Sequence, residues 1–299
     1  MIRRFLCFLL SLIACSPLCA DERVPAHLLR LPESVGTAFI TETSTSTFHR
    51  FDNRNGQPEY IGQSYISIGQ NGDGKRMSGD RRTPLGIYFV TEQRDMSRMH
   101  EKYGVTAFVL DYPNVLDKQS GKTGDGIWIH GVDARGGKRP PRDTDGCIAL
   151  PNDKLAAMAT LFRSNTTPVL VGRELKWSDP AELEALRLAL EAAVTTWAAS
   201  LGRGDMQAHL ALYSEDFHHW TMNKPEWSLL VRETLGQRPI TDVTVSELLL
   251  LADPNDEGLY LSRFGLMIIE GNQTFESTKR LYWRRAASGT LLIVAEDAG

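Results

Sequence analysis

Two short motifs contain the residue types that a thiol-based catalyst needs. His130 ends an apolar run and is followed by Gly131, while Gly146 directly precedes Cys147 further along the chain. A free thiol is mostly protonated near neutral pH, and a neighbouring imidazole favours the nucleophilic thiolate by forming an ion pair. The two motifs therefore predict that Cys147 attacks a carbonyl and that His130 returns the proton to the leaving amine.

The glycines beside these two residues indicate how the pair is held. The Gly131 carbonyl is expected to orient the imidazole, as a carboxylate does in a catalytic triad. Gly146 has no side chain, so we expect the amides of Gly146 and Cys147 to point at a developing oxyanion. Because residues 132–143 are rich in Gly, Pro and Arg, we expect a loop that brings Cys147 to face His130.

The first twenty residues have the pattern of an export signal. A basic start at Arg3 and Arg4 is followed by an apolar run and by Ala20, which predicts a signal peptide over 1–20 that is cleaved after Ala20. The alternative is lipidation of Cys15, which ends a lipobox-like stretch. We expect no membrane span, because the apolar run falls short of the ~20 residues that a bilayer needs.

Cysteine usage supports a functional thiol. The chain has four cysteines, and Cys147 is the one that lies beyond the expected cleavage site. An internal disulfide is then impossible, and an unpaired thiol in an oxidising compartment is a hazard unless it is buried or used. The neighbourhood of Cys147 favours use over burial.

The bulk composition places few bounds on function. The 299 residues include 42% hydrophobic and 23% charged residues, which is ordinary for a globular protein, and they allow two domains. A net charge of −4 without a Lys/Arg-rich tract does not support nucleic-acid binding. We make no prediction of an oligomeric state.

Hydrophobic periodicity divides the chain into two domains. Residues 21–35 are expected to be an N-terminal lead-in, 36–173 a mainly β domain with few helices, 174–180 a linker and 181–299 an α+β domain. In the first domain we expect strands over 37–41, 47–51, 60–61, 65–68, 86–90, 107–110, 126–130 and 168–171, with helices over 94–103 and 152–162. In the second we expect a helix from Asp179 to Gly202, helices over 205–213 and 227–235, and strands over 243–251, 258–270, 273–283 and 290–295.

The two motifs, together with an upstream Thr83-Pro84-Leu85-Gly86 turn, resemble the YkuD-type L,D-transpeptidase family. The resemblance covers about residues 36–172. It implies a β-sandwich in which Cys147 is the nucleophile, His130 the base and Gly131 the orienting carbonyl. It also implies that a periplasmic enzyme cuts or transfers L,D-peptide bonds of peptidoglycan tetrapeptide stems through an acyl-enzyme, without a cofactor.

Two positions depart from the commonest family pattern. Asp145 stands where that pattern has His, and Ala149 stands where it often has Arg. The stretch 144–150 looks most like a subgroup that includes L,D-carboxypeptidases governing cell shape. That subgroup carries a C-terminal cone-shaped domain of the nuclear-transport-factor type, and residues 197–217 are similar to its opening helices. The resemblance therefore favours trimming of D-Ala over transpeptidation or detachment of a lipoprotein from the wall.

Several residues near the pair are candidates for substrate contact. Arg142 and Arg139 could each bind a stem carboxylate in a bidentate manner, and Arg142 is preferred because it is nearest the nucleophile. Asp145 and Trp128 are further candidates, the latter as a pocket wall.

A second class of function is a non-catalytic wall-binding or scaffold protein that acts through its C-terminal domain. The intact His130 and Cys147 argue against it, since a scaffold needs neither residue. We expect no metal site. His218 and His219 are adjacent on an expected strand and would point to opposite faces.

Overall fold

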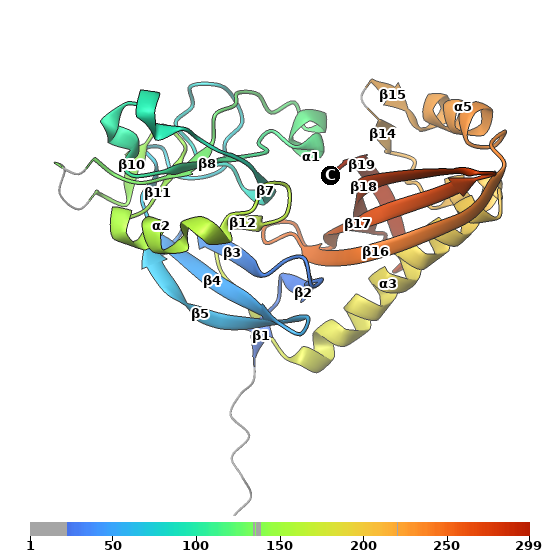
Figure 1. Ribbon diagram of the computed structural model, residues 1–299, viewed down its shortest axis with the longest axis horizontal. Coiled ribbons are helices and arrows are strands. Elements are labelled where there is room, and N and C mark those ends of the chain that lie inside the picture. Colours follow the sequence, from blue (N-terminus) through green and yellow to red (C-terminus); the bar gives the residue numbers. More distant parts are fainter. Residues whose placement is uncertain (1–22, 134, 136–138, 220) are drawn as a thin grey trace, which may run out of the picture.

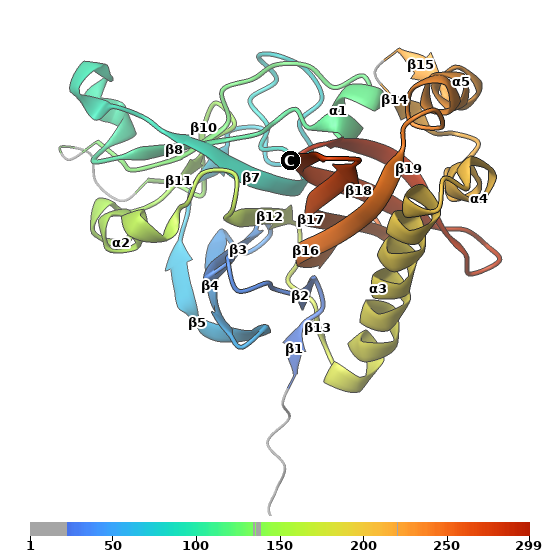
Figure 2. The same ribbon diagram turned by 45° about the vertical axis from the view of Figure 1, so that its right-hand side comes forward.

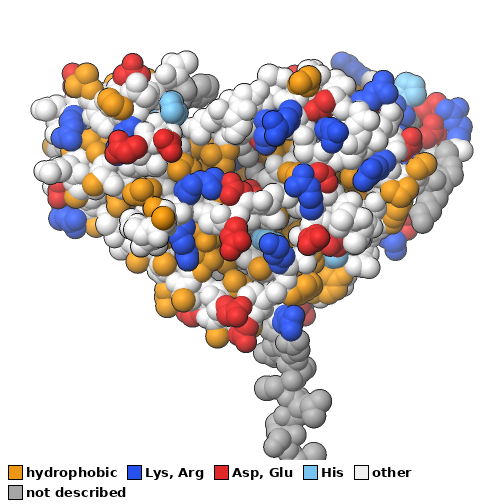
Figure 3. Space-filling model, turned by 180° about the vertical axis from the view of Figure 1, so that it is seen from behind, with side chains coloured by type: hydrophobic (Ala, Val, Ile, Leu, Met, Phe, Trp, Pro, Cys, Tyr) orange, Lys and Arg blue, Asp and Glu red, His pale blue; other side chains and the backbone are white. Residues whose placement is uncertain are grey.

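The computed structural model describes residues 23–133, 135, 139–219 and 221–299 (Figure 1). The expected signal peptide, with Cys15 and Ala20, lies outside these residues. No helix formed by the described residues is long and apolar enough to cross a membrane. Seen from behind, the molecule has two lobes with a notch between them, and acidic and basic side chains are interspersed on this face (Figure 3).

An eight-stranded mixed sheet organises the N-terminal lobe and confirms the mainly β prediction. Its strands are Thr37–Glu42 (β3), Thr47–Arg54 (β4), Gln57–Tyr65 (β5), Gly86–Gln93 (β7), Ala107–Leu110 (β8), Trp128–His130 (β9), Ile148–Ala149 (β11) and Pro168–Gly172 (β12). They lie in the order β11-β9-β8-β7-β12-β3-β4-β5. β12 joins the two halves, since it runs parallel to β3 and antiparallel to β7.

Short elements flank this sheet at the edge that carries His130 and Cys147. Ile68–Gly69 (β6) pairs in parallel with Arg142–Thr144 (β10), so the expected loop over 132–143 ends in a strand. The helices are Val115–Gln119 (α1) and Asn152–Met158 (α2), and the 3-10 turn Ala159–Leu161 (η3) continues α2.

The helix expected over 94–103 is replaced by two 3-10 turns, Met96–Arg98 (η1) and Glu101–Tyr103 (η2). The Asp95 carboxylate accepts from the Ser97 amide, and the His100 ring accepts from the Lys102 amide. These local side-chain bonds compete with the helical ladder, and each one starts a separate turn.

The C-terminal lobe is a five-stranded antiparallel sheet covered by helices, which confirms the α+β prediction (Figure 2). Its strands are Leu28–Arg30 (β2), Ile240–Ala252 (β16), Leu259–Glu270 (β17), Gln273–Arg285 (β18) and Leu291–Ala298 (β19), in the order β19-β18-β17-β16-β2. The helices are Pro180–Gly202 (α3), Met206–Ala211 (α4) and Lys224–Thr234 (α5). α3 begins as expected, because the Asp179 carboxylate caps the Ala181 amide and Pro180 is the first helical residue.

The segments expected to be a lead-in and a linker both contribute strands. β2 lies within the lead-in and pairs with β16 of the C-terminal sheet. Val24–Pro25 (β1) pairs with Trp177–Ser178 (β13), and a further small sheet joins His218–His219 (β14) to Met222–Asn223 (β15).

The two lobes share a hydrophobic core. Alternate residues of β3 face opposite ways, so Phe39 packs inside the N-terminal lobe while Ile40 packs toward the C-terminal sheet. Leu251 and Leu261 meet Ile40 in that shared core. An ion pair reinforces it, since the Arg280 guanidinium lies 2.5 Å from the Asp111 carboxylate of the N-terminal lobe.

Candidate active site

Strand pairing brings the two motifs together. His130 ends β9, Cys147 directly precedes β11, and these strands pair in parallel with Ala149 opposite His130. Extended by one residue, this register places Cys147 opposite Trp128. Trp128 and His130 lie two residues apart on β9, so Cys147 lies on the face of the sheet that also carries His130. The Trp128 amide lies 3.4 Å from the Cys147 sulfur, which agrees with this placement.

Both residues line one cavity of about 240 Å³. Its walls come from the end of β6, from η2, from β9 and from the segment that precedes Cys147. The lining residues are Gln70, Lys102, Tyr103, His130, Arg139, Asp143, Thr144, Asp145 and Cys147. The cavity therefore combines a nucleophile, a base and charged side chains of both signs.

The imidazole of His130 has a defined orientation. Its Nδ1 lies 2.6 Å from the Gly131 carbonyl oxygen. A carbonyl only accepts, so Nδ1 carries the proton and Nε2 is free to accept one from a thiol. The Tyr103 ring packs edge-on against the imidazole at a centroid distance of 5.1 Å. The carbonyl thus occupies the place of a triad carboxylate.

Asn152 fixes the backbone that follows His130, a role that sequence reasoning missed. Its Oδ1 accepts from the Val132 amide at 3.0 Å, and its Nδ2 donates to the Val132 carbonyl at 2.8 Å. A Cβ at Gly131 would lie 2.1 Å from Asn152 Oδ1, so only glycine allows this approach. The bonded Asn152 therefore holds the Gly131 carbonyl in place.

Two threonines shape the turn before the nucleophile. Thr144 Oγ1 donates to the Cys147 carbonyl at 2.7 Å, and Thr83 Oγ1 donates to the Gly146 carbonyl at 3.0 Å. Gly146 has φ +127, and a Cβ there would lie 2.7 Å from the Arg82 carbonyl oxygen. Both conditions require glycine at this position.

The same turn corrects one expectation. The Gly146 amide donates to Thr144 Oγ1 at 3.1 Å, so it is not free to bind an oxyanion. The Cys147 amide makes no hydrogen bond to the described part of the chain. Of the two amides expected at the oxyanion, Cys147 alone is available.

Burial sets the resting protonation of the pair. It raises the pKa of the Cys147 thiol to about 11, against the smaller opposing effect of the Trp128 amide. It also lowers the pKa of His130 to about 4, although the bond to Gly131 acts the other way. Both shifts favour a thiol and a neutral imidazole at neutral pH, whereas the sequence predicts an ion pair.

Charged neighbours modify these values in opposite directions. Asp145 raises the pKa of Cys147, while Lys102 and Arg139 lower it. The same two cations lower the pKa of His130, because they disfavour a charged imidazole.

The structure separates the candidates for substrate contact. Arg139 and Asp145 line the cavity, and Arg139 is held by the Asp143 carboxylate at 3.0 Å. Arg142 does not line it, because its guanidinium lies beside Gly72. Trp128 also lies outside the lining and packs against Tyr103 at a centroid distance of 5.0 Å.

Apart from Asp143 and Thr144, which lie just before Cys147, the cavity residues that sequence reasoning missed are Gln70, Lys102 and Tyr103. They reach the site through β6 and η2, and neither element carries a recognisable motif. Within the described residues no group of three His, Cys, Asp or Glu side chains is arranged to hold a metal ion.

The fold and site define a mainly β domain that presents a cysteine beside a carbonyl-oriented histidine. Residues 39–171 match the model of the YkuD family, described as the L,D-transpeptidase catalytic domain. This part of the chain is therefore similar to the catalytic domain of that family. A comparison with curated protein sequences gave no match.

Solved structures of similar architecture cover nearly the whole chain. The helical cell shape determining protein Pgp2 from Campylobacter jejuni is 25% identical, with a TM-score of 0.76 over 92% of this chain and 95% of that chain. Bdellovibrio bacteriovorus Bd1075 is 22% identical, with a TM-score of 0.77 over 93% of this chain and 98% of that chain. Both lobes therefore recur together in other proteins.

Proposed function

We propose that the chain is an exported cysteine enzyme that cleaves the L,D-peptide bond of peptidoglycan tetrapeptide stems through an acyl-enzyme. The observation that carries the proposal is the Cys147 thiol in one cavity with His130, whose Nδ1 is bound to the Gly131 carbonyl. The family match over residues 39–171 supports L,D-peptide bonds as the target.

The neutral resting pair determines the order of proton movement. As the Cys147 sulfur forms a bond to the substrate carbonyl carbon, its proton passes to Nε2 of His130. The developing oxyanion accepts from the Cys147 amide. The C–N bond then breaks, and His130 gives its proton to the leaving amine of D-Ala. A water, deprotonated by His130, attacks the thioester and releases the shortened stem and the free thiol.

Water as the acceptor makes the enzyme an L,D-carboxypeptidase, and an amine from a second stem makes it a transpeptidase. We favour the carboxypeptidase. Asp145 lines the cavity where the commonest pattern has His, and Ala149 is buried where that pattern often has Arg. These changes remove the usual contacts without altering the Cys147 and His130 pair. The similarity to a cell shape determining protein over most of the chain agrees with this choice.

Purified protein incubated with muropeptides and analysed by mass spectrometry tests the proposal. Loss of one D-Ala with nothing added supports the carboxypeptidase. Stem dimers, or exchange with added D-amino acids, identify a transpeptidase. Full activity in Cys147→Ala would refute the mechanism, and wild-type protein that binds muropeptides without changing them would favour a scaffold.

The site of action is part of the proposal. We propose that the chain is exported and acts in the periplasm, with cleavage after Ala20 preferred over lipidation of Cys15. Metabolic labelling with a radiolabelled fatty acid, combined with N-terminal sequencing of the mature protein, distinguishes these two outcomes. A mature protein that still begins at Met1 would contradict export by either route.

A further inference from the structure

A second cavity of about 560 Å³ is lined mainly by residues of the loop that leads to Thr83. We call it the basic cleft, because cationic side chains dominate its charged wall. These cations are Lys75, Arg76, Arg82, Lys122 and Arg173. Asp73 and Asp80 are the carboxylates that share the wall with them.

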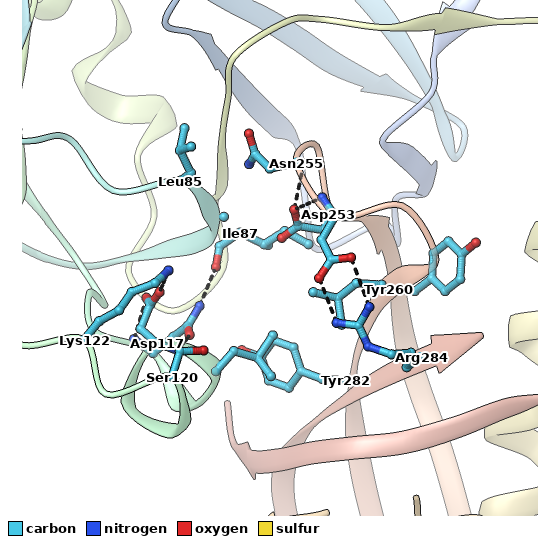
Figure 4. Close-up of a pocket in the computed structure, with 15 residues that line it drawn as sticks. Leu85, Ile87, Asp117, Ser120, Lys122, Asp253, Asn255, Tyr260, Tyr282 and Arg284 are labelled. Atoms are coloured by element: carbon cyan, nitrogen blue, oxygen red, sulfur yellow. Dashed lines mark hydrogen bonds and ion pairs between the residues drawn. The ribbon is translucent and has the colours of Figure 1, made fainter. Parts of the chain in front are cut away.

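Three of the cations are already neutralised. Lys75 is buried and lies 2.9 Å from the Asp80 carboxylate, and Arg173 lies 3.1 Å from that of Asp73. Lys122 lies 2.6 Å from Asp117, at the border with a neighbouring pocket between the two lobes (Figure 4).

The other two cations, Arg76 and Arg82, are exposed and make no ion pair with any carboxylate of the described residues. Among the described residues, the Arg82 guanidinium donates to the Asp73 carbonyl alone, at 2.9 Å. The cleft therefore presents two guanidinium groups without a counter-charge. Arginine matches the planar geometry of a carboxylate.

The loop that carries these arginines is preorganised. The Asp80 carboxylate accepts from the backbone amides of Arg76, Met77 and Arg82 as well as from Lys75 Nζ. This network holds both arginine backbones without using their guanidinium groups. A ligand that binds there does not have to order the loop first, which lowers the cost of binding.

The cleft and the active site lie on two sides of one chain segment. Arg81 contacts two residues that line the active-site cavity, since its guanidinium donates to Gln70 Oε1 at 3.0 Å and lies 3.9 Å from the Asp145 carboxylate. The next residue, Arg82, lines the basic cleft, and its carbonyl abuts Gly146. The residue before the nucleophile therefore contacts the backbone of a residue that lines the cleft, so a peptide held at Cys147 lies beside the segment that carries Arg82.

We propose that the basic cleft binds a carboxylate of the peptide that is cleaved at Cys147, at a position outside the scissile bond. This inference rests on the proposed function and names a substrate feature that the site selects. The cleft selects an acidic peptide, and Arg76 and Arg82 supply the contacts.

Two synthetic stem peptides that differ in one group test the proposal. In one peptide a carboxylate outside the scissile bond is free, and in the other it is amidated. For wild-type protein we expect amidation to raise KM about five- to twentyfold with little change in kcat, since a charge-assisted contact is lost. The Arg76→Gln/Arg82→Gln variant should show, for both peptides, the KM that wild-type protein has for the amidated peptide. Arg82→Lys should retain part of the wild-type preference for the free carboxylate.

Arg203→Gln is the matched control, because Arg203 is exposed at the end of α3, distant in sequence from both cavities. It should retain the wild-type preference. Equal KM values for the two peptides in wild-type protein, or an unchanged preference in the double variant, would overturn the proposal. An unchanged thermal unfolding midpoint confirms that the double variant folds.

A binding measurement separates this proposal from the proposed function. Fluorescence anisotropy with Cys147→Ala and the two labelled peptides reports affinity without chemistry. Tighter binding of the free carboxylate supports the cleft even if wild-type protein cleaves neither peptide. Equal affinities, no binding of either peptide, or displacement by inorganic phosphate with no effect of amidation would each overturn it.

Discussion

Thr83 Oγ1 donates to the Gly146 carbonyl at 3.0 Å and accepts from the Gly69 amide at 2.9 Å. Thr83 is fully buried, so this hydroxyl satisfies two backbone groups that have no access to water. It connects the Thr-Pro turn to the nucleophile turn, although the two are far apart in sequence. The upstream motif therefore has a structural reason, which is to hold the peptide unit that precedes Cys147.

The first prediction concerns this contact. Thr83→Val keeps the shape of the side chain but leaves the Gly146 carbonyl and the Gly69 amide unpaired. We expect a loss of about 1–3 kcal/mol in the free energy of unfolding, the usual cost of a buried unsatisfied group. We also expect kcat to fall at least about tenfold, because the nucleophile turn loosens. Urea unfolding and steady-state kinetics measure the two effects.

Thr83→Ser is the matched control for that prediction, since it retains the hydroxyl and removes only a methyl group. Its kcat should stay near the wild-type value. If Thr83→Val also keeps wild-type activity, the contact between Thr83 and Gly146 does not position the nucleophile.

The second prediction concerns the pH dependence of the thiol. Burial raises the pKa of Cys147 to about 11, so iodoacetamide should alkylate it slowly at pH 7 and faster as the pH rises toward 11. Burial lowers the pKa of His130 to about 4, so the imidazole stays a neutral base above that pH. Activity should therefore fall only as the pH approaches 4 from above.

The charges of Asp145 and Arg139 test the direction of these effects on the Cys147 thiol. Asp145 raises the pKa of Cys147, so Asp145→Asn should increase the alkylation rate at pH 8. Arg139 lowers it, so Arg139→Gln should have the opposite effect. An alkylation rate that is already maximal at pH 6 would show a thiolate–imidazolium pair at rest and contradict the neutral pair.

The third prediction concerns Asn152 as a positioning residue. Asn152→Ala removes the bonds to the Val132 amide and carbonyl and releases the backbone beside Gly131. We expect kcat to fall about ten- to hundredfold with a smaller change in KM, because misplacement of the base affects the transition state more than binding. The pKa of His130 should also rise from about 4, since a looser site admits water.

Two measurements separate that role from a purely structural one. The acid limb of the kcat profile should move to higher pH in Asn152→Ala. The 13C chemical shift of the His130 imidazole should titrate at the same pH. A variant that loses stability while both titrations stay unchanged would show that Asn152 only supports the fold.

Motifs in the sequence were sufficient to find the reacting residues but not their surroundings. His130 and Cys147 could be paired because each lies beside a glycine at the end of a predicted strand or loop. Tyr103 and Lys102 reach the same cavity from a 3-10 turn, whose position depends on local caps and leaves no periodic signal. The neutral resting state could not be predicted either, because it follows from burial and not from residue type.

The arrangement of the two lobes was also hidden in the sequence. β2 has three residues, too few for a recognisable alternation, so the lead-in gave no sign that it pairs with β16. The Gly146 amide was expected at the oxyanion because glycine is permissive. Its actual partner, Thr144 Oγ1, is a side chain two residues away, and such local bonds depend on a turn conformation that composition does not determine.

The fourth prediction concerns the ion pair that joins the lobes. The Arg280 guanidinium lies 2.5 Å from the carboxylates of Asp111 and Asp297, and its side chain is 11% exposed. Arg280→Met leaves two buried carboxylates without a counter-charge, which should destabilise the protein by about 3–5 kcal/mol at pH 8. Burial already raises the pKa of Asp111 and of Asp297 above the usual value, although Arg280 opposes that effect.

The sign of the pH effect follows from those two shifts. A carboxyl group whose pKa is raised in the folded state binds a proton more readily when folded than when unfolded. Its stabilising effect is therefore lost as the pH rises through the folded pKa. Without Arg280 the pKa values of Asp111 and Asp297 should rise further. The loss in the free energy of unfolding caused by Arg280→Met should therefore become smaller as the pH is lowered from 8 to 5. Urea unfolding at a series of pH values measures it.

The triple variant Arg280→Met/Asp111→Asn/Asp297→Asn is the matched control, because it removes the carboxylates together with their cation. It should recover most of the lost stability and show no such pH dependence. A deficit in Arg280→Met that is the same at pH 5 and pH 8 would mean that the lost contact of the Arg280 guanidinium with the Phe89 ring, and not unpaired charge, causes the destabilisation.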